Sequence, residues 1–425
     1  MMRPALLSVL GACWLATAAG AAEAEKIVDL RTTLIVEAAA ERNLTLERGR
    51  VERAEEYEPQ LRLQARFFPE RRVWGLIETE LIRRIKRERG EPTETDNRLN
   101  LTHAYLAIED VLPDTRLRLG RWLQRDEREW LMDENLDGVH LEYDRGRWEG
   151  ELFVARVDHW RRDLLDNDSH GEPVNFIAAF GRYEMDRKWV KDWQIGAYVV
   201  RQHDVSAEET WLNHVGLRSH ATPDKGWRHW LELAHVGGRD GGERVDGHAI
   251  DLGVTYAFDT APLRPRLTLG YAYASGDPER GDRGGGAYRQ TGLHSNEATF
   301  GGVAKFHIYG ETLDPDLSNL HVLTAGLGLD LGRELSLDLV YHRYRQDVLS
   351  KVRETELDPE EDRRDDRYLG DAFDLVLGWR PSDRVKLEAA LGWFRPSSRF
   401  RSDDDDDAPR GGDAYSARLE FNYRF

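Results

Sequence analysis

Apolar and polar residues alternate one by one along the last segment of the chain. One set of positions holds Leu419, Phe421, Tyr423 and Phe425, and the other holds Arg418, Glu420, Asn422 and Arg424. Because side chains alternate across a β-strand, this segment predicts a strand with one apolar and one charged face. Such a strand at a chain end would be an aggregation hazard unless its edge were paired, most simply by closure of the sheet into a barrel.

The same alternation recurs throughout the second half of the sequence. It predicts strands over 250–258, 267–274, 323–331, 335–341, 373–379 and 385–393. Each is close to the 9–11 residues that a tilted strand needs to cross the hydrocarbon layer of a membrane. The first half is less regular: it predicts strands near 27–37, 44–53, 59–68 and 72–84 and eight more between 100 and 236, and the composition of 81–90 also fits a helix. The predicted fold is an all-β, transmembrane, antiparallel barrel of about 18 strands.

The connections between these strands alternate in length. Residues 332–334 and 381–384 form short turns, whereas 275–320, 346–370 and 395–413 are long and polar. Outer-membrane barrels have short periplasmic turns and long extracellular loops, so the pattern places the C terminus at the periplasm. Small residues on one face of the predicted strands are expected to leave open space in the lumen. A soluble sandwich is the alternative interpretation of the final strand.

The first residues of the chain have the three parts of a secretory signal. Arg3 is followed by an apolar stretch to Ala19 and by the small residues Gly20, Ala21 and Ala22. This predicts a signal peptide over 1–22 and a single barrel domain over 23–425. Cys13, the only cysteine, also fits a lipoprotein cleavage box, and it would be lost with the signal peptide.

Charge and hydropathy exclude other classes of protein. The chain is 32% charged with a net charge of −18, and an acidic protein of this size is a poor nucleic-acid binder. A mean hydropathy of −0.65 is compatible with a barrel, because only alternate residues face lipid. No phosphate loop, dinucleotide fingerprint or haem-attachment pair is present, so no cofactor is predicted.

Several blocks of sequence resemble the alginate-export family of outer-membrane porins. They are Leu119-Gly-Arg-Trp122 followed by 126–133, Gly270-Tyr-Ala-Tyr-Ala-Ser-Gly-Asp277, Tyr288-Arg-Gln-Thr-Gly-Leu-His-Ser-Asn296 and Asp314-Pro-Asp-Leu-Ser-Asn-Leu320, in this order before 337–345. The resemblance implies an eighteen-stranded barrel that passes an acidic polysaccharide outward by diffusion. It also implies contacts with outer-membrane lipid, the barrel-assembly machinery and periplasmic export proteins, and a monomer.

The family lines its lumen with arginines, because guanidinium groups compensate the carboxylates of a polyuronate while many weak sites let it move. The resemblance places such groups at Arg31, Arg62 and Arg121. At four positions where it implies arginine, this chain has Thr102, Tyr273, Glu388 and Ala390. Glu388 is expected to face the lumen, and we therefore predict weaker selectivity for acidic sugars than in a true alginate exporter.

The sequence has further charges near predicted strand ends that could form a constriction with a transverse field. The candidates are Arg121, Arg125, Arg128 and Glu127 in one segment, Arg156 and Asp158 in a second, His342, Arg343 and Arg345 in a third, and Arg289 in the longest loop. For any single residue, a position on the rim in contact with water is the simpler interpretation. A general or uptake porin for small charged or sugar solutes is the alternative function.

Two other features have simpler explanations than a site. The run from Asp403 to Asp407 offers carboxylates to calcium, with Asp403, Asp405 and Asp407 as candidates, but a run of like charge is usually a solvated loop. Ser336, Asp338 and His342 share one predicted strand face, as an outer-membrane hydrolase would need. Residues two apart on a strand are about 6.5 Å apart, too far for a Ser–His hydrogen bond. We therefore predict that the protein is not an enzyme.

Overall fold

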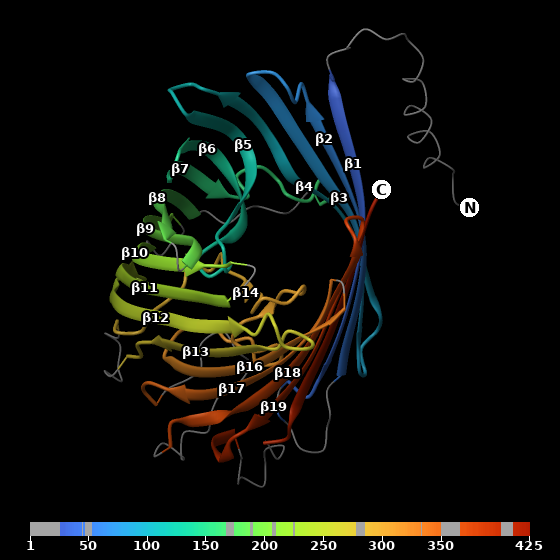
Figure 1. Cartoon of the computed structure of the whole chain (residues 1–425), viewed down its shortest axis with the longest axis vertical. Coiled ribbons are helices and arrows are strands. Elements are labelled where there is room, and N and C mark those ends of the chain that lie inside the picture. The colour runs from blue at the N-terminus through green and yellow to red at the C-terminus, as the bar shows by residue number, and fades with distance from the viewer. Residues whose placement is uncertain are drawn as a thin grey trace, which may run out of the picture.

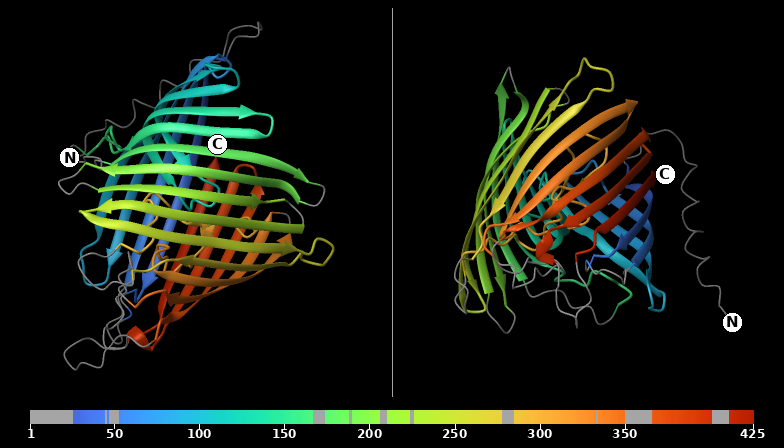
Figure 2. Two further views of the ribbon diagram at one scale, coloured as in Figure 1. Left: turned by 90° about the vertical axis from the view of Figure 1, so that its left-hand side faces the viewer. Right: turned by 90° about the horizontal axis from the view of Figure 1, so that it is seen from below.

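The computed structural model is a closed antiparallel barrel of 18 strands, seen from one end in Figure 1 and from two further sides in Figure 2. The structure describes residues 26–44, 46, 53–166, 174–187, 190–205, 210–223, 226–277, 285–332, 334–349, 366–400 and 411–425. The predicted signal peptide lies outside these residues. No helix in the described part of the chain is long and apolar enough to cross a membrane.

The barrel strands are 9 to 16 residues long, and many extend beyond the predicted segments. They are β1 (Val28–Arg42), β2 (Arg53–Phe67), β3 (Val73–Glu88), β4 (Glu94–Glu109), β5 (Thr115–Arg125), β6 (Asp133–Arg145), β7 (Trp148–Val157), β8 (Val174–Arg187), β9 (Val190–Asp204), β10 (Thr210–Ala221), β11 (Gly226–Asp240), β12 (Glu243–Ala257), β13 (Arg266–Ala274), β16 (Leu320–Gly332), β17 (Leu335–Gln346), β18 (Tyr368–Ser382), β19 (Val385–Pro396) and β20 (Ala414–Arg424). Two-residue strands β14 (Glu297–Ala298) and β15 (Phe306–His307) pair with each other separately.

The prediction of 18 strands is confirmed, with two corrections in the first half. Residues 81–88 belong to β3 and are not helical, because their backbone pairs with β2 on one side and with β4 on the other, and this pairing overrides their helix-compatible composition. The predicted strand at 44–53 is wrong where it can be compared: β1 ends at Arg42 and β2 begins at Arg53, so Leu44 and Leu46 lie in a connection. The rest of that segment lies outside the described residues.

The last strand closes the barrel. In β20, Tyr423 lies opposite Leu34 of β1, and Leu419 lies opposite Ala38. On its other side, β20 pairs with β19. No edge of the large sheet is therefore left open between the first strand and the last, as the alternation at the C terminus predicts.

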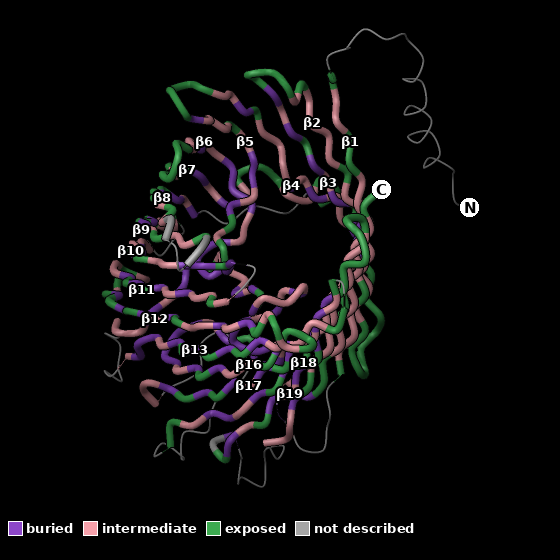
Figure 3. The backbone as a smooth tube through the Cα atoms, in the orientation of Figure 1, coloured by how far each residue is buried: buried purple, intermediate pink, exposed green. Residues whose placement is uncertain are grey.

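The strand faces divide the structure into an apolar outside and a mixed inside. Along β13, Leu267, Leu269 and Tyr271 are exposed on the outer face, while Thr268 and Ala272 are buried on the inner face. The alternation of exposed and buried positions along the wall is visible in Figure 3. We call the end where β20 finishes the turn end, because its connections, such as 383–384 and 146–147, are short; the opposite end is the loop end.

Candidate functional site

The longest connection runs over 275–319, and its described part, 285–319, folds into the barrel instead of projecting from it (Figure 1). Its backbone N–H at Val303 donates to Ser336 Oγ of β17 at 2.7 Å. The Lys305 N–H donates to Glu388 Oε1 of β19 at 2.8 Å. These bonds attach the segment, which we call the inner loop, to the inner faces of two barrel strands.

The inner loop is rich in buried apolar side chains. They are Tyr288, Phe300, Phe306, Ile308, Tyr309, Leu313 and Leu317, each less than 10% exposed. The Phe300 ring stacks on Trp230 of β11, with ring centroids 5.4 Å apart. Gly253 and Gly270 lie where any Cβ would meet the Trp230 ring. The expectation that small inner-face residues leave open lumen is thus wrong on this side, because they make room for Trp230 and the inner loop that packs on it.

A second connection, 126–132 between β5 and β6, also folds inward and joins the inner loop. Trp130 Nε1 donates to the Tyr309 hydroxyl at 2.7 Å, and Gln290 Nε2 donates to the Trp130 carbonyl at 2.7 Å. Glu129 pairs with Lys305 and accepts a hydrogen bond from Ser295 Oγ at 2.5 Å. The two loops thus form one packed unit that narrows the lumen.

A central cavity of about 980 Å³, which we also call the passage, lies between this unit and the inner faces of β1–β4, β19 and β20. Its basic lining residues are Arg62, Arg125, Arg162, Lys305, Arg380, Arg384, Lys386, Arg418 and Arg424, and its acidic lining residues are Glu37, Glu78, Glu80, Glu129, Asp133, Glu134, Glu297, Asp383, Glu388 and Glu420. Because basic and acidic side chains are present in nearly equal numbers, the cavity has no strong net field of one sign.

Most basic groups inside the cavity are paired with carboxylates. Arg62 Nη2 lies 2.6 Å from Glu80 Oε1, and Arg418 Nη1 lies 2.7 Å from Glu297 Oε1. Lys386 Nζ lies 2.6 Å from Glu388 Oε2. A charged solute must therefore compete with existing ion pairs, which favours many weak contacts over one tight site.

In the wall next to the central cavity, the neighbouring strands β4 and β5 are paired over only part of their length; we call this partly paired junction the seam. β4 pairs with β5 only from Ala104 to Glu109, whereas β5 pairs with β6 along its whole length. Beyond the pair of Ala104 with Arg121, the loop-end half of β5 separates from β4. Leu123 and Arg125 of this half line the central cavity. The separation explains how a strand face that would otherwise meet lipid faces the lumen.

Residues 158–166, which we call the strap, fill the gap in the wall. The Leu101 N–H donates to the Arg162 carbonyl at 2.9 Å, and the Leu164 N–H donates to the Leu99 carbonyl at 2.9 Å. Trp160, Leu164 and Leu165 of the strap are exposed. Its Arg161, Arg162 and Asp163 line a second cavity of about 760 Å³ together with residues of β2, β3 and β4. The strap thus replaces β5 as the partner of the loop-end half of β4.

Arg121 lies where the seam opens and is fully buried. Its Nε and Nη2 donate to Asp137 Oδ1 and Oδ2, each at 2.6 Å, and its Nη1 donates to the Leu101 carbonyl at 2.9 Å. Asp158 Oδ1 lies 3.3 Å from Arg121 Nη2. The interpretation of Arg121 as a lumen arginine is therefore wrong: it joins β4, β6 and the strap and presents no surface to a solute.

Four other residues that were predicted to face the lumen lie on the inner surface of the barrel. Arg62, Arg125 and Glu388 line the central cavity. Arg31 is exposed on the same face of β1 as the cavity-lining Thr33 and Ile35, close to the turn end. These positions follow from the alternation along β1, β2 and β19 and, for Arg125, from the seam.

Three predicted residues are held in contacts away from the open passage. Arg128 is buried against Trp230, with its guanidinium carbon 4.3 Å from the ring centroid and Nη2 3.3 Å from Asp251. Glu127 contacts Arg182 at 2.5 Å and Arg218 at 3.3 Å. Burial raises the pKa of Glu127, but Arg218, His220 and Arg182 outweigh it and lower the pKa to about 2. Arg289 forms an ion pair with Asp240.

Three predictions of pore-lining residues are wrong because the side chains are on the outer face. Arg156 shares its face of β7 with the exposed Leu152 and Val154. Arg343 and Arg345 share the face of the exposed Leu339 on β17, and the Arg343 guanidinium lies 4.8 Å from the Tyr368 ring centroid. The alternation of side chains along β7 and β17 places all three on the outer face, although each lies near a strand end.

The three residues considered for a hydrolase each have a different partner. Ser336 Oγ accepts the Val303 N–H at 2.7 Å. Asp338 pairs with Arg266 at 3.1 Å. His342 is fully buried with Nε2 3.2 Å from Asp374 Oδ2 and Nδ1 3.0 Å from Thr324 Oγ1. His342 is therefore an inner-wall residue and is not exposed in the passage.

Three carboxylates of the run 403–407 are the calcium candidates. Asp403, Asp405 and Asp407 lie outside the described residues. Within the described ranges, no group of three or more His, Cys, Asp or Glu side chains is placed to hold a metal ion.

Sequence interpretation missed several cavity residues. Arg380, Arg384 and Arg424 line the central cavity towards the turn end, and Lys305 and Glu297 reach it from the inner loop. For Arg424 the alternation of β20 was a sufficient signal. For Lys305 and Glu297 the signal was weaker: the many aromatic residues between 288 and 309 do not fit an exposed polar loop.

Comparison with known sequences decides the family. The profile of the family described as alginate export matches residues 29–412, which is nearly the whole barrel. The chain belongs to the alginate export family. It is accordingly an outer-membrane β-barrel in contact with outer-membrane lipid, and its short turns face the periplasm.

Two curated relatives from this family are similar over part of the chain. The alginate production protein AlgE of Pseudomonas aeruginosa is 32% identical over 272 residues, covering 55% of this chain and 53% of that protein. AlgE of Azotobacter vinelandii is 30% identical over 183 residues, covering 38% of this chain and 37% of that protein. The matches thus span about half the length of these relatives or less.

Solved structures show the same fold at low sequence identity. OccK5 (OpdH) of Pseudomonas aeruginosa has a TM-score of 0.57 with 12% identity, covering 93% of this chain and 98% of that one. OccK2 (OpdF) of the same organism, in complex with glucuronate, has a TM-score of 0.56 with 15% identity, covering 93% and 96%. OccAB3 of Acinetobacter baumannii has a TM-score of 0.57 with 11% identity, covering 93% and 99%. The alginate export barrel and these Occ proteins share their architecture.

Proposed function

We propose that the protein is a passive channel that exports an anionic, alginate-like polysaccharide from the periplasm across the outer membrane. The observation that carries the proposal is the group of three arginines, Arg380, Arg384 and Arg424, towards the periplasmic mouth of the central cavity. Arg31 lies on the same inner surface near this end. A cluster of like charge raises the local concentration of a ligand of opposite sign.

Membership of the alginate export family supports this substrate class, as does the arrangement of charges along the passage. A polyuronate captured at the mouth next meets basic groups that already have carboxylate partners, among them Arg62, Arg418 and Lys386. Each contact is weakened by its partner, so the chain can move onward. We also propose that the protein acts as a monomer, is inserted by the barrel-assembly machinery and receives its substrate from periplasmic proteins.

A diffusion channel for small charged solutes is the second candidate. The observation that favours it is that the inner loop and 126–132 occupy part of the lumen beside a central cavity of about 980 Å³ whose charges are nearly balanced. The structurally similar OccK2 was solved with glucuronate, a single uronic acid. A small-solute channel would need no capture of a long chain at the periplasmic mouth.

Single-channel recording in planar bilayers tests the two candidates. Oligouronates of increasing length added on the turn-end side should block current more strongly as length grows, and neutral oligosaccharides of equal size should block weakly. The Arg380→Gln/Arg384→Gln/Arg424→Gln variant should lose this block. The matched control is Arg145→Gln, because Arg145 is an exposed arginine at the turn end of β6. Equal block by uronate monomers and long oligomers would favour the small-solute channel instead.

A further inference from the structure

The outer face of the barrel has a row of aromatic side chains near the loop end. Strand register places Tyr341 opposite Phe373, Phe373 opposite Trp393, and Trp393 opposite Tyr415. The rings of Tyr341 and Phe373 are 5.1 Å apart, and those of Phe373 and Trp393 are 5.6 Å apart. Rows of this kind mark the membrane–water boundary of outer-membrane barrels.

The row continues across the closure of the barrel, but its next members are arginines. Tyr415 of β20 lies opposite Arg42 of β1, and Arg42 lies opposite Arg53 of β2. The Arg42 guanidinium lies 5.9 Å from the centre of the Tyr415 ring. Arg87 of β3 lies opposite Glu55, one outward position closer to the membrane centre. At the level of the lipid headgroups, β1–β3 thus present guanidinium groups in place of aromatic rings.

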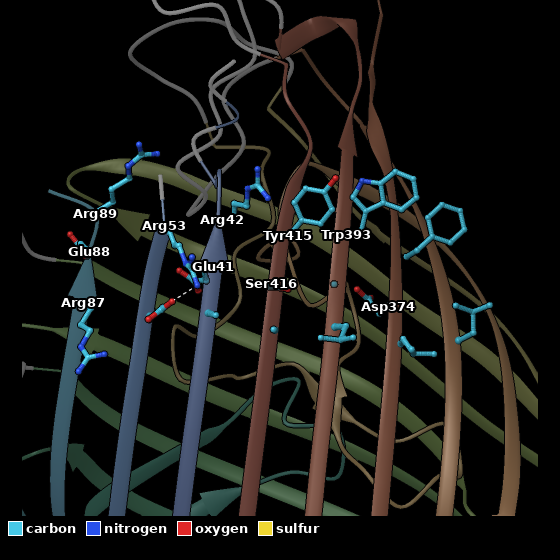
Figure 4. A pocket seen from close by; sticks show the side chains of 18 residues that line it. Glu41, Arg42, Arg53, Arg87, Glu88, Arg89, Asp374, Trp393, Tyr415 and Ser416 are labelled. Carbon is cyan, nitrogen blue, oxygen red and sulfur yellow. Dashed lines mark ion pairs between the residues drawn. The ribbon is translucent and has the colours of Figure 1, made fainter. Parts of the chain in front are cut away.

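A groove of about 1140 Å³ lies between the arginines and the aromatic row (Figure 4). Ala40 of β1 and Ala417 of β20 lie opposite each other, and their small side chains form its floor. On one side the register continues to Leu391 and Leu375, which are 54% and 40% exposed. On the other side Ala40 lies opposite Glu55, and the guanidinium groups of Arg42, Arg53 and Arg87 lie around that carboxylate. The groove is therefore apolar along one wall and basic along the other.

This arrangement fits an amphipathic anion. Arginine suits phosphate because its planar fork can donate two parallel hydrogen bonds to phosphate oxygens. Three outward-facing arginines, Arg42, Arg53 and Arg87, and one outward-facing carboxylate, Glu55, line this side of the groove, and Arg53 lies 2.5 Å from Glu55. Glu41 and Glu88 also line the groove, from the alternate positions of β1 and β3. The leucines and aromatic rings beside the alanine floor offer a surface for an acyl chain. Because the loop end faces away from the periplasm, the lipid available there is that of the outer leaflet.

We infer that this groove binds a phosphorylated glycolipid of the outer leaflet, with its phosphate at Arg42, Arg53 and Arg87 and an acyl chain over Ala417, Leu391 and Leu375. The site is on the outside of the wall, separate from the central cavity. It spans the junction of β1 with β20, where the first and last strands of the chain meet. A bound lipid would bridge the two strands whose pairing closes the barrel.

Native mass spectrometry of the full-length barrel in detergent tests the inference. The probe is bisphosphorylated lipid A, with the same lipid stripped of both phosphates, phosphatidylethanolamine and inorganic phosphate as comparisons. We expect one bisphosphorylated lipid A per barrel and at least tenfold weaker binding of the dephosphorylated form, since charge-assisted hydrogen bonds are lost. Equal binding of the two lipids would overturn the assignment, and so would displacement of the lipid by equimolar inorganic phosphate.

Two variants locate the site. Arg42→Gln/Arg53→Gln/Arg87→Gln should bind lipid A at least tenfold more weakly, and Ala417→Leu, which fills the floor and keeps every arginine, should also weaken binding. The matched control is Arg244→Gln, because Arg244 is 82% exposed on the outer face at the loop end of β12, far from β1 in strand order. Heat-modifiable gel mobility shows that each variant is folded. Wild-type affinity in the triple variant, or an equal loss in Arg244→Gln, would overturn the proposed site.

Discussion

Arg121 and Asp137 form a doubly hydrogen-bonded ion pair that has no exposed surface, at the point where β4 and β5 separate. Asp137 Oδ2 also accepts the Trp160 N–H at 2.9 Å, so one carboxylate holds both the arginine and the strap. Neither residue can contact a solute. Their role is to close the wall beside the passage.

We predict that Arg121→Gln destabilises the barrel strongly. Removal of one partner leaves the Asp137 carboxylate buried and uncompensated, which costs about 3–5 kcal/mol. The measurement is the temperature at which the folded band disappears on heat-modifiable gels. Arg125→Gln is the control: Arg125 pairs with Asp133, but its side chain is 45% exposed, so the loss should be about 0–1 kcal/mol. Equal effects of the two changes would contradict the structural role of Arg121.

The terminal aromatic residue gives a second prediction. Phe425 is 65% exposed, and its backbone N–H donates to the Thr32 carbonyl at 3.0 Å. The ring centroids of Phe425 and Tyr423 are 4.9 Å apart. The last residue is thus paired with β1 and presents its ring on the outside at the turn end. Phe425→Asp should sharply reduce the amount of heat-modifiable barrel in outer membranes. Asn422→Ala, on the inner face of the same strand, is the control, and normal levels of folded Phe425→Asp barrel would show that the ring is not needed for assembly.

The alternation of apolar and polar residues was enough to predict the strands of the barrel and their faces, but not the packing of the segments inside the lumen. Leu267, Leu269 and Tyr271 face outward because parity alone decides the face of a regular strand. Arg156 could have been excluded from the lumen by the same rule. The position of Arg121 could not, because it depends on Asp137 and Trp160, which are 16 and 39 residues away. The sequence predicts 275–320 as a long polar loop, although its aromatic residues, such as Tyr288 and Phe306, are a signal of packing; that signal does not tell which strands the loop packs against.

Glu388 provides a third prediction, on selectivity. It lines the central cavity beside Lys386, and its Oε1 accepts the Lys305 N–H, so Gln can keep that hydrogen bond while removing the charge. A charge about 8 Å from a solute in a wet pore contributes on the order of 1 kcal/mol, or about fivefold in affinity. Glu388→Gln should therefore strengthen the block of single-channel current by oligouronates.

The control for this prediction is Glu94→Gln, an exposed carboxylate at the start of β4. It should leave the block unchanged. The structure argues against testing Ala390→Arg alongside Glu388, because Ala390 is only 3% exposed and an arginine would not fit there. Unchanged block in Glu388→Gln would mean that the carboxylate is already neutralised by Lys386 and does not set selectivity.

The inner loop contains a histidine whose charge should hold its fold in the lumen. His307 Nδ1 lies 3.0 Å from Asp314 Oδ1, and its Nε2 lies 3.6 Å from Glu297 Oε1. Glu311 Oε1 accepts the His307 backbone N–H at 3.0 Å, and both glutamates also pair with Arg418. Burial lowers the pKa of His307, but Asp314, Glu311 and Glu297 outweigh it and raise the pKa to about 9.

The predicted consequence is a loosening of the inner loop at alkaline pH. Because the pKa is raised from 6.5 to about 9 on folding, the stabilisation is complete below pH 6.5 and is lost as the pH rises through about 9. Above that value Asp314 faces an uncharged imidazole, and Arg418 is the cation that remains beside Glu297 and Glu311. The β14–β15 pair should therefore open, and single-channel conductance should rise and become noisier. His307→Gln, which is neutral at every pH, should show the alkaline behaviour already at pH 7 and lose the transition. His235→Gln is the control, since its side chain is 54% exposed on β11, and it should keep the wild-type profile. A conductance transition that persists unchanged in His307→Gln would show that another group controls the inner loop.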